Sequence, residues 1–98
     1  MPELLSDSAV IGELDSLPGW TLNGTSLSRT WTLKGFNGAV QLANVVAWIA
    51  NQAKHHPDVS IHDYNQVTVT TTTHDAGGVT DKDVDLARRI STTLGENA

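Results

Sequence analysis

The chain contains no cysteine, and this absence excludes two kinds of site at once. Without thiols the protein has no disulfide framework and no thiolate ligand for a metal ion. The acidic N-terminal stretch MPELLSDSAV has no basic region and no small-residue cleavage site, so we predict no signal peptide. The cytoplasm is therefore the expected compartment.

Basic residues are scarce, and long apolar runs are missing. Six Lys and Arg residues stand against eleven Asp and Glu residues, which gives a formal net charge of −5. Only Arg88 and Arg89 are adjacent, so the sequence has no basic stripe that could follow a phosphate backbone. We therefore expect no direct binding to nucleic acid. No apolar segment approaches the roughly 20 residues of a transmembrane helix, and we expect no membrane partner.

Aromatic side chains are also few. Three tryptophans, one tyrosine and one phenylalanine among 98 residues provide a thin hydrophobic core. A chain of this length buries only roughly 60–65% of its unfolded surface, which leaves a small margin of stability. We predict one domain over residues 1–98, and association with further copies would stabilise it.

The first third of the chain predicts a helix followed by a β-hairpin. A serine at position 6 or 8 can cap the helix, whose apolar positions are Val10, Ile11, Leu14 and Leu17. Pro18-Gly19 ends this helix, and Asn23-Gly24 is a strong signal for a tight turn between two strands. Trp20 and Trp31 are predicted to lie in the core.

The stretch FNGAVQLANVVAWIANQAKHH predicts the main helix, with apolar residues around most of its circumference. A helix that covers one sheet needs only one apolar stripe. The additional apolar surface therefore predicts burial on a second side, against another subunit.

The last third predicts a second hairpin and a final helix. Val59 and Ile61 alternate in one strand, and the next strand alternates at Val67, Val69, Thr71 and Thr73. Its many threonines suit a pleated surface half exposed to water. Asp63-Tyr64-Asn65 is the expected turn, and Thr80 with Asp83 predicts a capping box. The order α-β-β-α-β-β-α predicts an α+β two-layer fold, in which helices cover one face of a four-stranded antiparallel sheet.

Four histidines fall within a twenty-residue window, in which two of them adjoin in KHHPD. An imidazole exchanges protons near neutral pH because its unperturbed pKa is about 6.5. Pro57 disfavours a helical conformation at His56, so His55 is expected at the helix C-terminus and His56 in an extended link. His74 lies near the end of the fourth strand, and Asp83 lies in the first turn of the last helix. If these segments meet at one sheet edge, three imidazoles and a carboxylate form an acid/base site suited to elimination of water.

Each of these residues also has a simpler interpretation. The adjacent histidines could form a polar helix end, His74 could be an ordinary strand-end residue, and capping alone explains Asp83. His62 is expected to face solvent and is assigned no role. His55, His56, His74 and Asp83 could in principle bind zinc, but adjacent side chains diverge and no HExxH motif is present. We therefore expect no metal and no cofactor.

Taken together, KHHPD, Tyr64-Asn65, Thr73-His74, Gly78, Thr80, Asp83 and LARRI resemble the pterin-4a-carbinolamine dehydratases over nearly the whole chain. The resemblance implies the same fold and the dehydration of 4a-hydroxytetrahydropterin to quinonoid dihydropterin without a metal. It also implies that His55, His56 and His74 are catalytic, that Pro57 and Asp83 bind or orient the pterin substrate or its histidines, and that the protein forms a homodimer or homotetramer.

The sequence departs from the family pattern at Asn51, where many members carry an acidic residue four places before the first histidine. The departure concerns a carboxylate near the site and leaves the histidines untouched. Relatives of this fold also act as non-catalytic partners, either as dimerisation cofactors of a transcription factor or as assembly factors for a carboxylating enzyme. A protein-binding module is therefore the alternative function.

Overall fold

The structure is a computed structural model that describes residues 3–96. Its elements are α1 (Asp7–Leu14), β1 (Thr21–Asn23), β2 (Ser26–Thr32), α2 (Phe36–Ala53), β3 (Asp58–His62), β4 (Gln66–Thr71), the short 3₁₀-helix η1 (His74–Ala76) and α3 (Asp81–Thr93). The four strands form one antiparallel sheet in the order β1-β2-β4-β3. The predicted α+β fold and its element order are thus confirmed.

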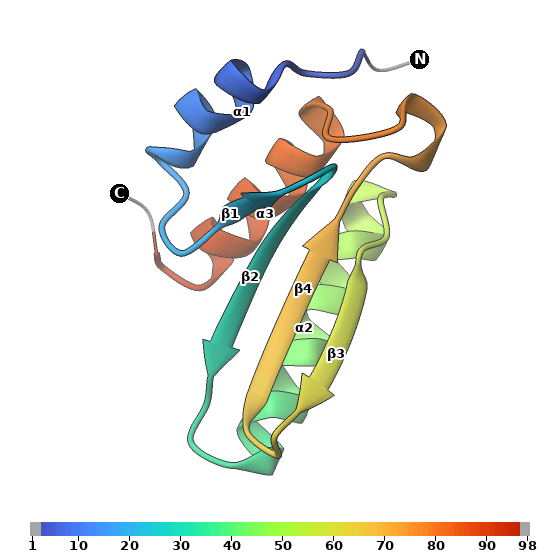
Figure 1. Ribbon diagram of the computed structural model, residues 1–98. Helices are drawn as coiled ribbons and strands as arrows, with labels where there is room; N and C mark the ends of the chain where they lie inside the picture. Colours follow the sequence, from blue (N-terminus) through green and yellow to red (C-terminus); the bar gives the residue numbers. More distant parts are fainter. Residues whose placement is uncertain (1–2, 97–98) are drawn as a thin grey trace.

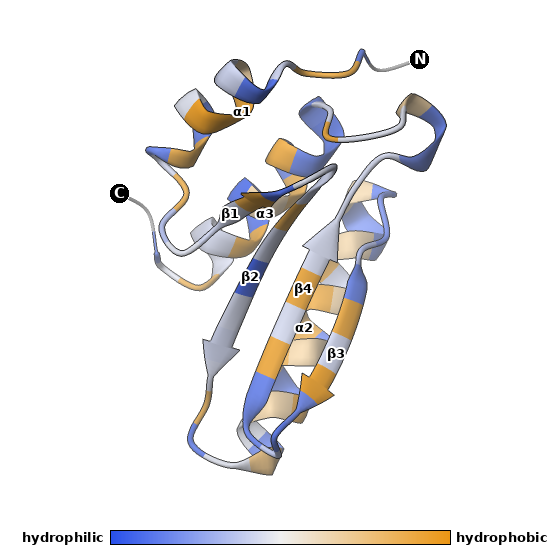
Figure 2. Ribbon diagram, viewed as in Figure 1, coloured by the Kyte–Doolittle hydropathy of each residue, from blue (hydrophilic) through white to orange (hydrophobic). Residues whose placement is uncertain are grey.

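The helices lie on one side of the sheet. Figure 1 shows α2 behind β4 and β3, α3 behind the β1–β2 hairpin, and α1 beside the upper end of that hairpin. Figure 2 shows hydrophobic and hydrophilic residues alternating along β3 and β4, as a sheet with one covered face requires. The alternation places Val67 and Val69 under the helices and Gln66, Thr68 and Thr70 on the other face.

The core lies between the sheet and the helices. Its fully buried large side chains include Leu17, Leu27, Val46, Leu86 and Ile90. Trp20 and Trp31 are buried as predicted, and their rings meet edge to face with centroids 5.8 Å apart. Two predictions for α1 are wrong. The helix ends at Leu14, before Pro18-Gly19, and Ile11 is 57% exposed, whereas Val10 is buried and Leu14 packs against the core.

Helix α2 buries one stripe and leaves apolar residues on its other side. The buried stripe consists of Ala39, Leu42, Val46, Ile49 and Ala50. On the outer side, Val45 is exposed and Trp48 is 64% exposed. No helix within residues 3–96 is long and apolar enough to cross a membrane.

Candidate active site

The C-terminal end of α2 fixes the backbone of His55. The helix ends in a Schellman motif, in which Lys54 adopts a left-handed conformation with φ 56°. The N–H of Lys54 donates to the carbonyl of Asn51, and the N–H of His55 donates to the carbonyl of Ala50 at 3.2 Å. The left-handed residue reverses the chain, so that His55 lies against the body of the protein and its side chain is only 12% exposed.

The N-terminal end of α3 fixes Asp83. Thr80 is the N-cap residue, and the predicted capping box is present. The backbone N–H of Thr80 donates to Asp83 Oδ2 at 2.9 Å, and the Thr80 hydroxyl accepts from the N–H of Lys82. The positive end of the helix dipole also stabilises a carboxylate at this position.

The carboxylate of Asp83 is fully buried and joins three elements. Its Oδ1 accepts a hydrogen bond from the Thr71 hydroxyl at 2.6 Å and lies 2.6 Å from His55 Nε2. Its Oδ2 accepts from the Thr73 hydroxyl at 2.7 Å as well as from Thr80. A buried carboxylate is tolerated when its oxygens are hydrogen-bonded, and this one has a donor at every acceptor position that it offers.

His56 points elsewhere, as the divergence of adjacent side chains requires. It is exposed, and its Nε2 donates to Asn51 Oδ1 at 2.9 Å. The neutral amide of Asn51 thus holds an imidazole at the position where an acidic residue is typical of the family. Pro57 is half-buried in the link that leads from α2 to β3.

His74 is the residue after Thr73, which donates a hydrogen bond to Asp83. It begins η1 directly after Thr73, whereas the sequence had placed it in the strand. The strand β4 ends at Thr71, and the chain turns back through Gly77, so that Thr73 pairs with Gly78. His74 is exposed, and the structure gives its side chain no hydrogen bond to another described residue. Among residues 3–96, no three His, Asp or Glu side chains gather as a group that could hold a metal ion.

His62 lies on the open, solvent-facing side of the sheet, as predicted. It is half-buried on the open face of the sheet, where its Nδ1 lies 2.9 Å from Asp63 and its Nε2 lies 2.7 Å from the Thr68 hydroxyl. Alternation had indicated the correct face, but the neighbouring β4 side chain covers part of the ring. These contacts belong to the sheet and the turn after β3 and do not include His55 or Asp83.

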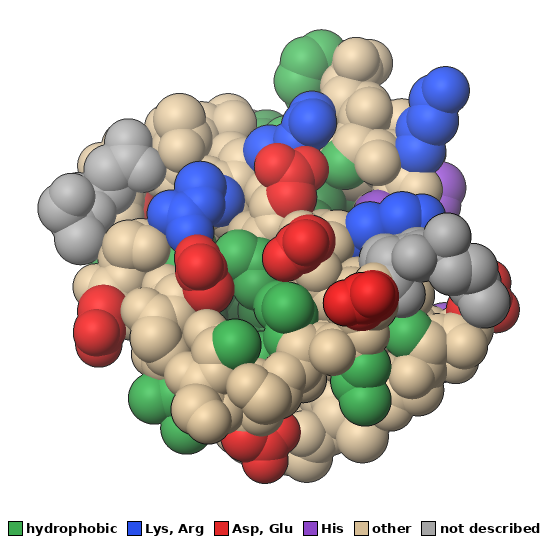
Figure 3. Space-filling model, turned by 90° about the horizontal axis from the view of Figure 1, so that it is seen from above, with side chains coloured by type: hydrophobic (Ala, Val, Ile, Leu, Met, Phe, Trp, Pro, Cys, Tyr) green, Lys and Arg blue, Asp and Glu red, His purple; other side chains and the backbone are tan. Residues whose placement is uncertain are grey.

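The arrangement is suited to proton exchange at one end of the molecule. Seen from above, Figure 3 shows histidine side chains reaching the surface beside basic side chains at one edge of this face. An imidazole hydrogen-bonded to a buried carboxylate is held in one orientation and one tautomer, and the carboxylate stabilises the imidazolium that forms when the ring takes up a proton.

Sequence reasoning missed Thr71 and Thr73 as partners of this site. Both are buried, whereas the β4 threonines had been expected on a half-exposed surface. The sequence did contain an indication of this. Thr71 and Thr73 continue the every-second-residue spacing of Val67 and Val69, so their side chains point to the same face of the sheet, under the helices. A buried hydroxyl needs a partner, and both of these hydroxyls donate to the carboxylate of Asp83, which comes from another element.

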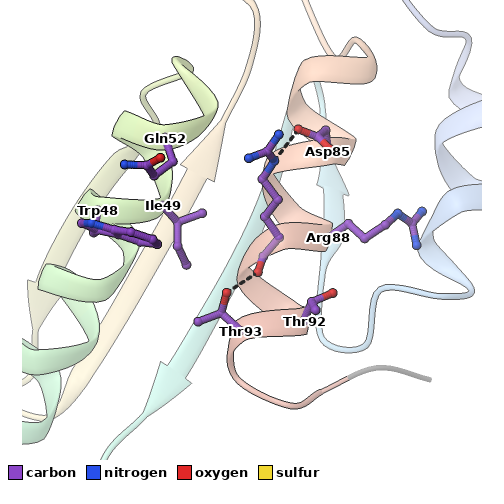
Figure 4. A pocket seen from close by; sticks show the side chains of 8 residues that line it. Trp48, Ile49, Gln52, Asp85, Arg88, Thr92 and Thr93 are labelled. Atoms are coloured by element: carbon purple, nitrogen blue, oxygen red, sulfur yellow. Dashed lines mark hydrogen bonds and ion pairs between the residues drawn. The ribbon is translucent and has the colours of Figure 1, made fainter.

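A pocket among the described residues lies away from the histidines, between α2 and α3. It has a volume of about 440 Å³ and is lined by Trp48, Ile49, Gln52, Asp85, Arg88, Arg89, Thr92 and Thr93. Figure 4 shows Trp48, Ile49 and Gln52 on α2 facing the Asp85 and Thr93 side of α3, while Arg88 turns away from α2. Both arginines have acidic partners, since Arg88 binds Glu13 and Arg89 binds Asp85.

Comparison with known proteins assigns the chain to a family. The family model described as pterin 4 alpha carbinolamine dehydratase matches residues 3–93. A protein of Thermosynechococcus vestitus, provisionally named a pterin-4-alpha-carbinolamine dehydratase, is 48% identical over 91 residues, which are 93% of this chain and 95% of the relative. A protein of Nocardia farcinica with the same provisional name is 47% identical over 88 residues, which are 90% of this chain and 92% of the relative.

Two solved structures have a similar fold. A transcriptional coactivator/pterin dehydratase from Brucella melitensis is 32% identical and superposes with a TM-score of 0.80, over 90% of this chain and 95% of that one. A pterin dehydratase-like protein described as a RuBisCO assembly factor in the α-carboxysome is 13% identical, with a TM-score of 0.59 over 78% of this chain and 87% of that one, so it shares the fold. By the family model and these relatives, the chain belongs to the pterin 4 alpha carbinolamine dehydratase family.

Proposed function

We propose that this protein is a hydro-lyase that dehydrates 4a-hydroxytetrahydropterin to quinonoid dihydropterin in the recycling of tetrahydropterin. In this reaction the C4a–O bond breaks, and the 4a-hydroxyl leaves as water after it has received a proton. The proton on the neighbouring ring nitrogen is removed, and its electron pair forms the new C=N bond. The proposal needs one proton donor and one proton acceptor, and it includes no metal and no cofactor.

The histidines supply these groups in the proposal. One imidazolium, of His55 or His74, protonates the departing hydroxyl, and a neutral imidazole takes the ring proton. His56 helps to bind the pterin, Pro57 directs the link that carries His56, and Asp83 orients His55. The observation that carries the proposal is the 2.6 Å contact between His55 Nε2 and the buried Asp83. It brings an imidazole and a carboxylate together, although the two residues are 28 positions apart in the chain.

The direct test is a spectroscopic assay with freshly prepared 4a-hydroxytetrahydropterin. The purified protein is expected to accelerate the appearance of quinonoid dihydropterin well above the uncatalysed rate. Chelator-treated protein is the control, and it should retain the activity because the mechanism uses no metal. A rate equal to that of the buffer would reject the dehydratase proposal and favour the alternative function.

The alternative is a non-catalytic protein-binding module, either a dimerisation cofactor of a transcription factor or an assembly factor for a carboxylating enzyme.

The predicted homodimer or homotetramer is compatible with both functions, and we propose the outer side of α2 as its contact surface. The outer side of α2 carries an exposed tryptophan beside a pocket whose arginines are already paired with acidic residues. Such a surface offers apolar area without net charge. Because a like surface on a second copy is equally apolar and equally neutral, we propose another copy of this chain as its occupant, within a homodimer or homotetramer.

Substituting Trp48→Glu is expected to lower the oligomeric state. The substitution places a charge at the centre of the proposed contact, where it would lack a partner. Analytical ultracentrifugation at micromolar concentration should show an oligomer for the wild type and a smaller species for the variant. Phe36→Glu, at an exposed aromatic residue at the opposite end of α2, is the matched control. A wild type that sediments only as a monomer would rule out the second copy.

A further inference from the structure

The hydrogen bonds around Asp83 have a determinable direction. The Thr71 hydroxyl has one proton, which it donates to Asp83 Oδ1. The Thr73 hydroxyl likewise donates its proton to Asp83 Oδ2, so in its 2.7 Å contact with the Thr80 hydroxyl it can only accept. Thr80 therefore donates to Thr73 and accepts from the N–H of Lys82. The hydroxyl protons of this buried hydrogen-bond network therefore all point toward the carboxylate.

This directionality decides which nitrogen of His55 carries the proton. Two threonine hydroxyls and one backbone N–H already donate to Asp83, which is the arrangement that suits a carboxylate anion. The fourth contact, to His55 Nε2, then has a carboxylate oxygen as acceptor, so the imidazole is the donor. Neutral His55 is thereby held as the Nε2–H tautomer, and its lone pair lies on Nδ1. The structure gives Nδ1 no hydrogen-bond partner among residues 3–96.

We propose that Thr71 and Thr73 are positioning residues for catalysis, which fix the Nε2–H tautomer of His55 through Asp83 and so make Nδ1 the nitrogen that exchanges a proton with the substrate. This inference rests on the proposed dehydratase function for its kinetic consequence, but the tautomer itself is a property of the free protein. It holds whether His55 acts as acid or as base, because Nε2 stays bound to Asp83 in both protonation states.

Substitution by valine removes each hydroxyl while nearly keeping the shape of the side chain. In Thr71→Val and Thr73→Val, Asp83 loses one donor and can rotate or share its remaining partners. We expect kcat to fall about tenfold in each variant, as the loss of one hydrogen bond to a charged group predicts, with little change in KM. The serine variants at the same positions keep the hydroxyl and should recover most of the loss.

Thr72→Val is the matched control. Thr72 lies between the two threonines in the sequence, but its hydroxyl donates to the backbone carbonyl of Thr25 instead of to Asp83. This variant should keep wild-type kcat. Thermal unfolding of all variants identifies any that fail to fold. If a valine variant does not fold, the tautomer of His55 in the wild type still tests the inference.

Nitrogen-15 NMR of the histidine rings supplies the readout that does not depend on activity. At about pH 8.5, well above the ordinary imidazole pKa, wild-type His55 should show a protonated Nε2 and an unprotonated Nδ1. Thr71→Val and Thr73→Val should show a mixture of tautomers, and Thr72→Val the wild-type pattern. A protonated Nδ1 in the wild type, or an unchanged tautomer in both valine variants, would overturn the inference. If the tautomers behave as expected and the protein shows no turnover, the proposed function fails and the positioning of His55 stands.

Discussion

Replacing His55 by alanine is expected to lower kcat about 10²–10⁴-fold, which is the usual contribution of one positioned proton-transfer group. The same substitution at His74 should produce a loss in the same range, because the elimination needs both a donor and an acceptor of protons. The rate of quinonoid dihydropterin formation measures both effects. The fold should survive, since His55 lies at a helix end and His74 is exposed.

His62→Ala is the control for these two variants. It removes the same side chain from the open face of the sheet, where the imidazole contacts Asp63 and Thr68. Its kcat should remain within about twofold of the wild type, as is usual for a surface substitution away from a site. Near-wild-type rates in both His55→Ala and His74→Ala would remove the histidines from the mechanism, whatever the family of the chain.

Replacing Asp83 by alanine is expected to destabilise the protein by about 3–5 kcal/mol, because each buried donor left without its acceptor costs about 1–3 kcal/mol. The substitution leaves two buried hydroxyls, the Thr80 N–H and the His55 Nε2–H without their acceptor. A domain has about 5–15 kcal/mol of stability in total, so the variant should be close to unfolding. Urea unfolding, monitored by tryptophan fluorescence, measures the change in free energy.

Two further variants separate the role of Asp83 in the network from its role as a cap. Asp81→Ala removes an exposed acidic residue from the same helical turn, and it should cost about 0.3–1 kcal/mol through the helix dipole alone. Asp83→Asn keeps the shape of the side chain but brings an NH₂ group toward other donors. Its loss of stability should therefore lie between those of Asp83→Ala and Asp81→Ala. A loss of about 1 kcal/mol in Asp83→Ala, the size of an ordinary cap, would contradict a network role.

The sequence predicted most of the fold because its signals are local. Turn residues such as Asn23-Gly24, the capping box at Thr80 and the apolar alternation in β4 each act within a few residues. Local signals were less reliable where packing decides. Ile11 has helical spacing but is 57% exposed. Residue preference suggested a half-exposed surface for Thr71, whereas its alternation with Val67 and Val69 indicated the buried face that it occupies.

The candidate site, like the fold, was predicted in part from the sequence. The proton-carrying residues His55, His56 and His74 could be named from the sequence, because few residue types exchange protons near neutral pH and a His-His-Pro stretch is distinctive. Their resemblance to a family added the expected reaction. Spacing along the chain could not reveal which of them contacts Asp83, because that contact joins separate elements.

By itself, then, the amino-acid sequence determined the order of the elements, the covered face of the sheet and the types of side chain available for chemistry. These follow from hydrophobic periodicity, turn chemistry and intrinsic pKa values, which act over short stretches of chain. The tertiary structure alone decided that the carboxylate of Asp83 is buried beneath Thr71 of β4 and Thr73, which follows β4, and that it faces His55. That outcome depends on how α2, β4 and α3 pack at one sheet edge, where burial makes every unpaired polar group costly and so selects one arrangement of partners.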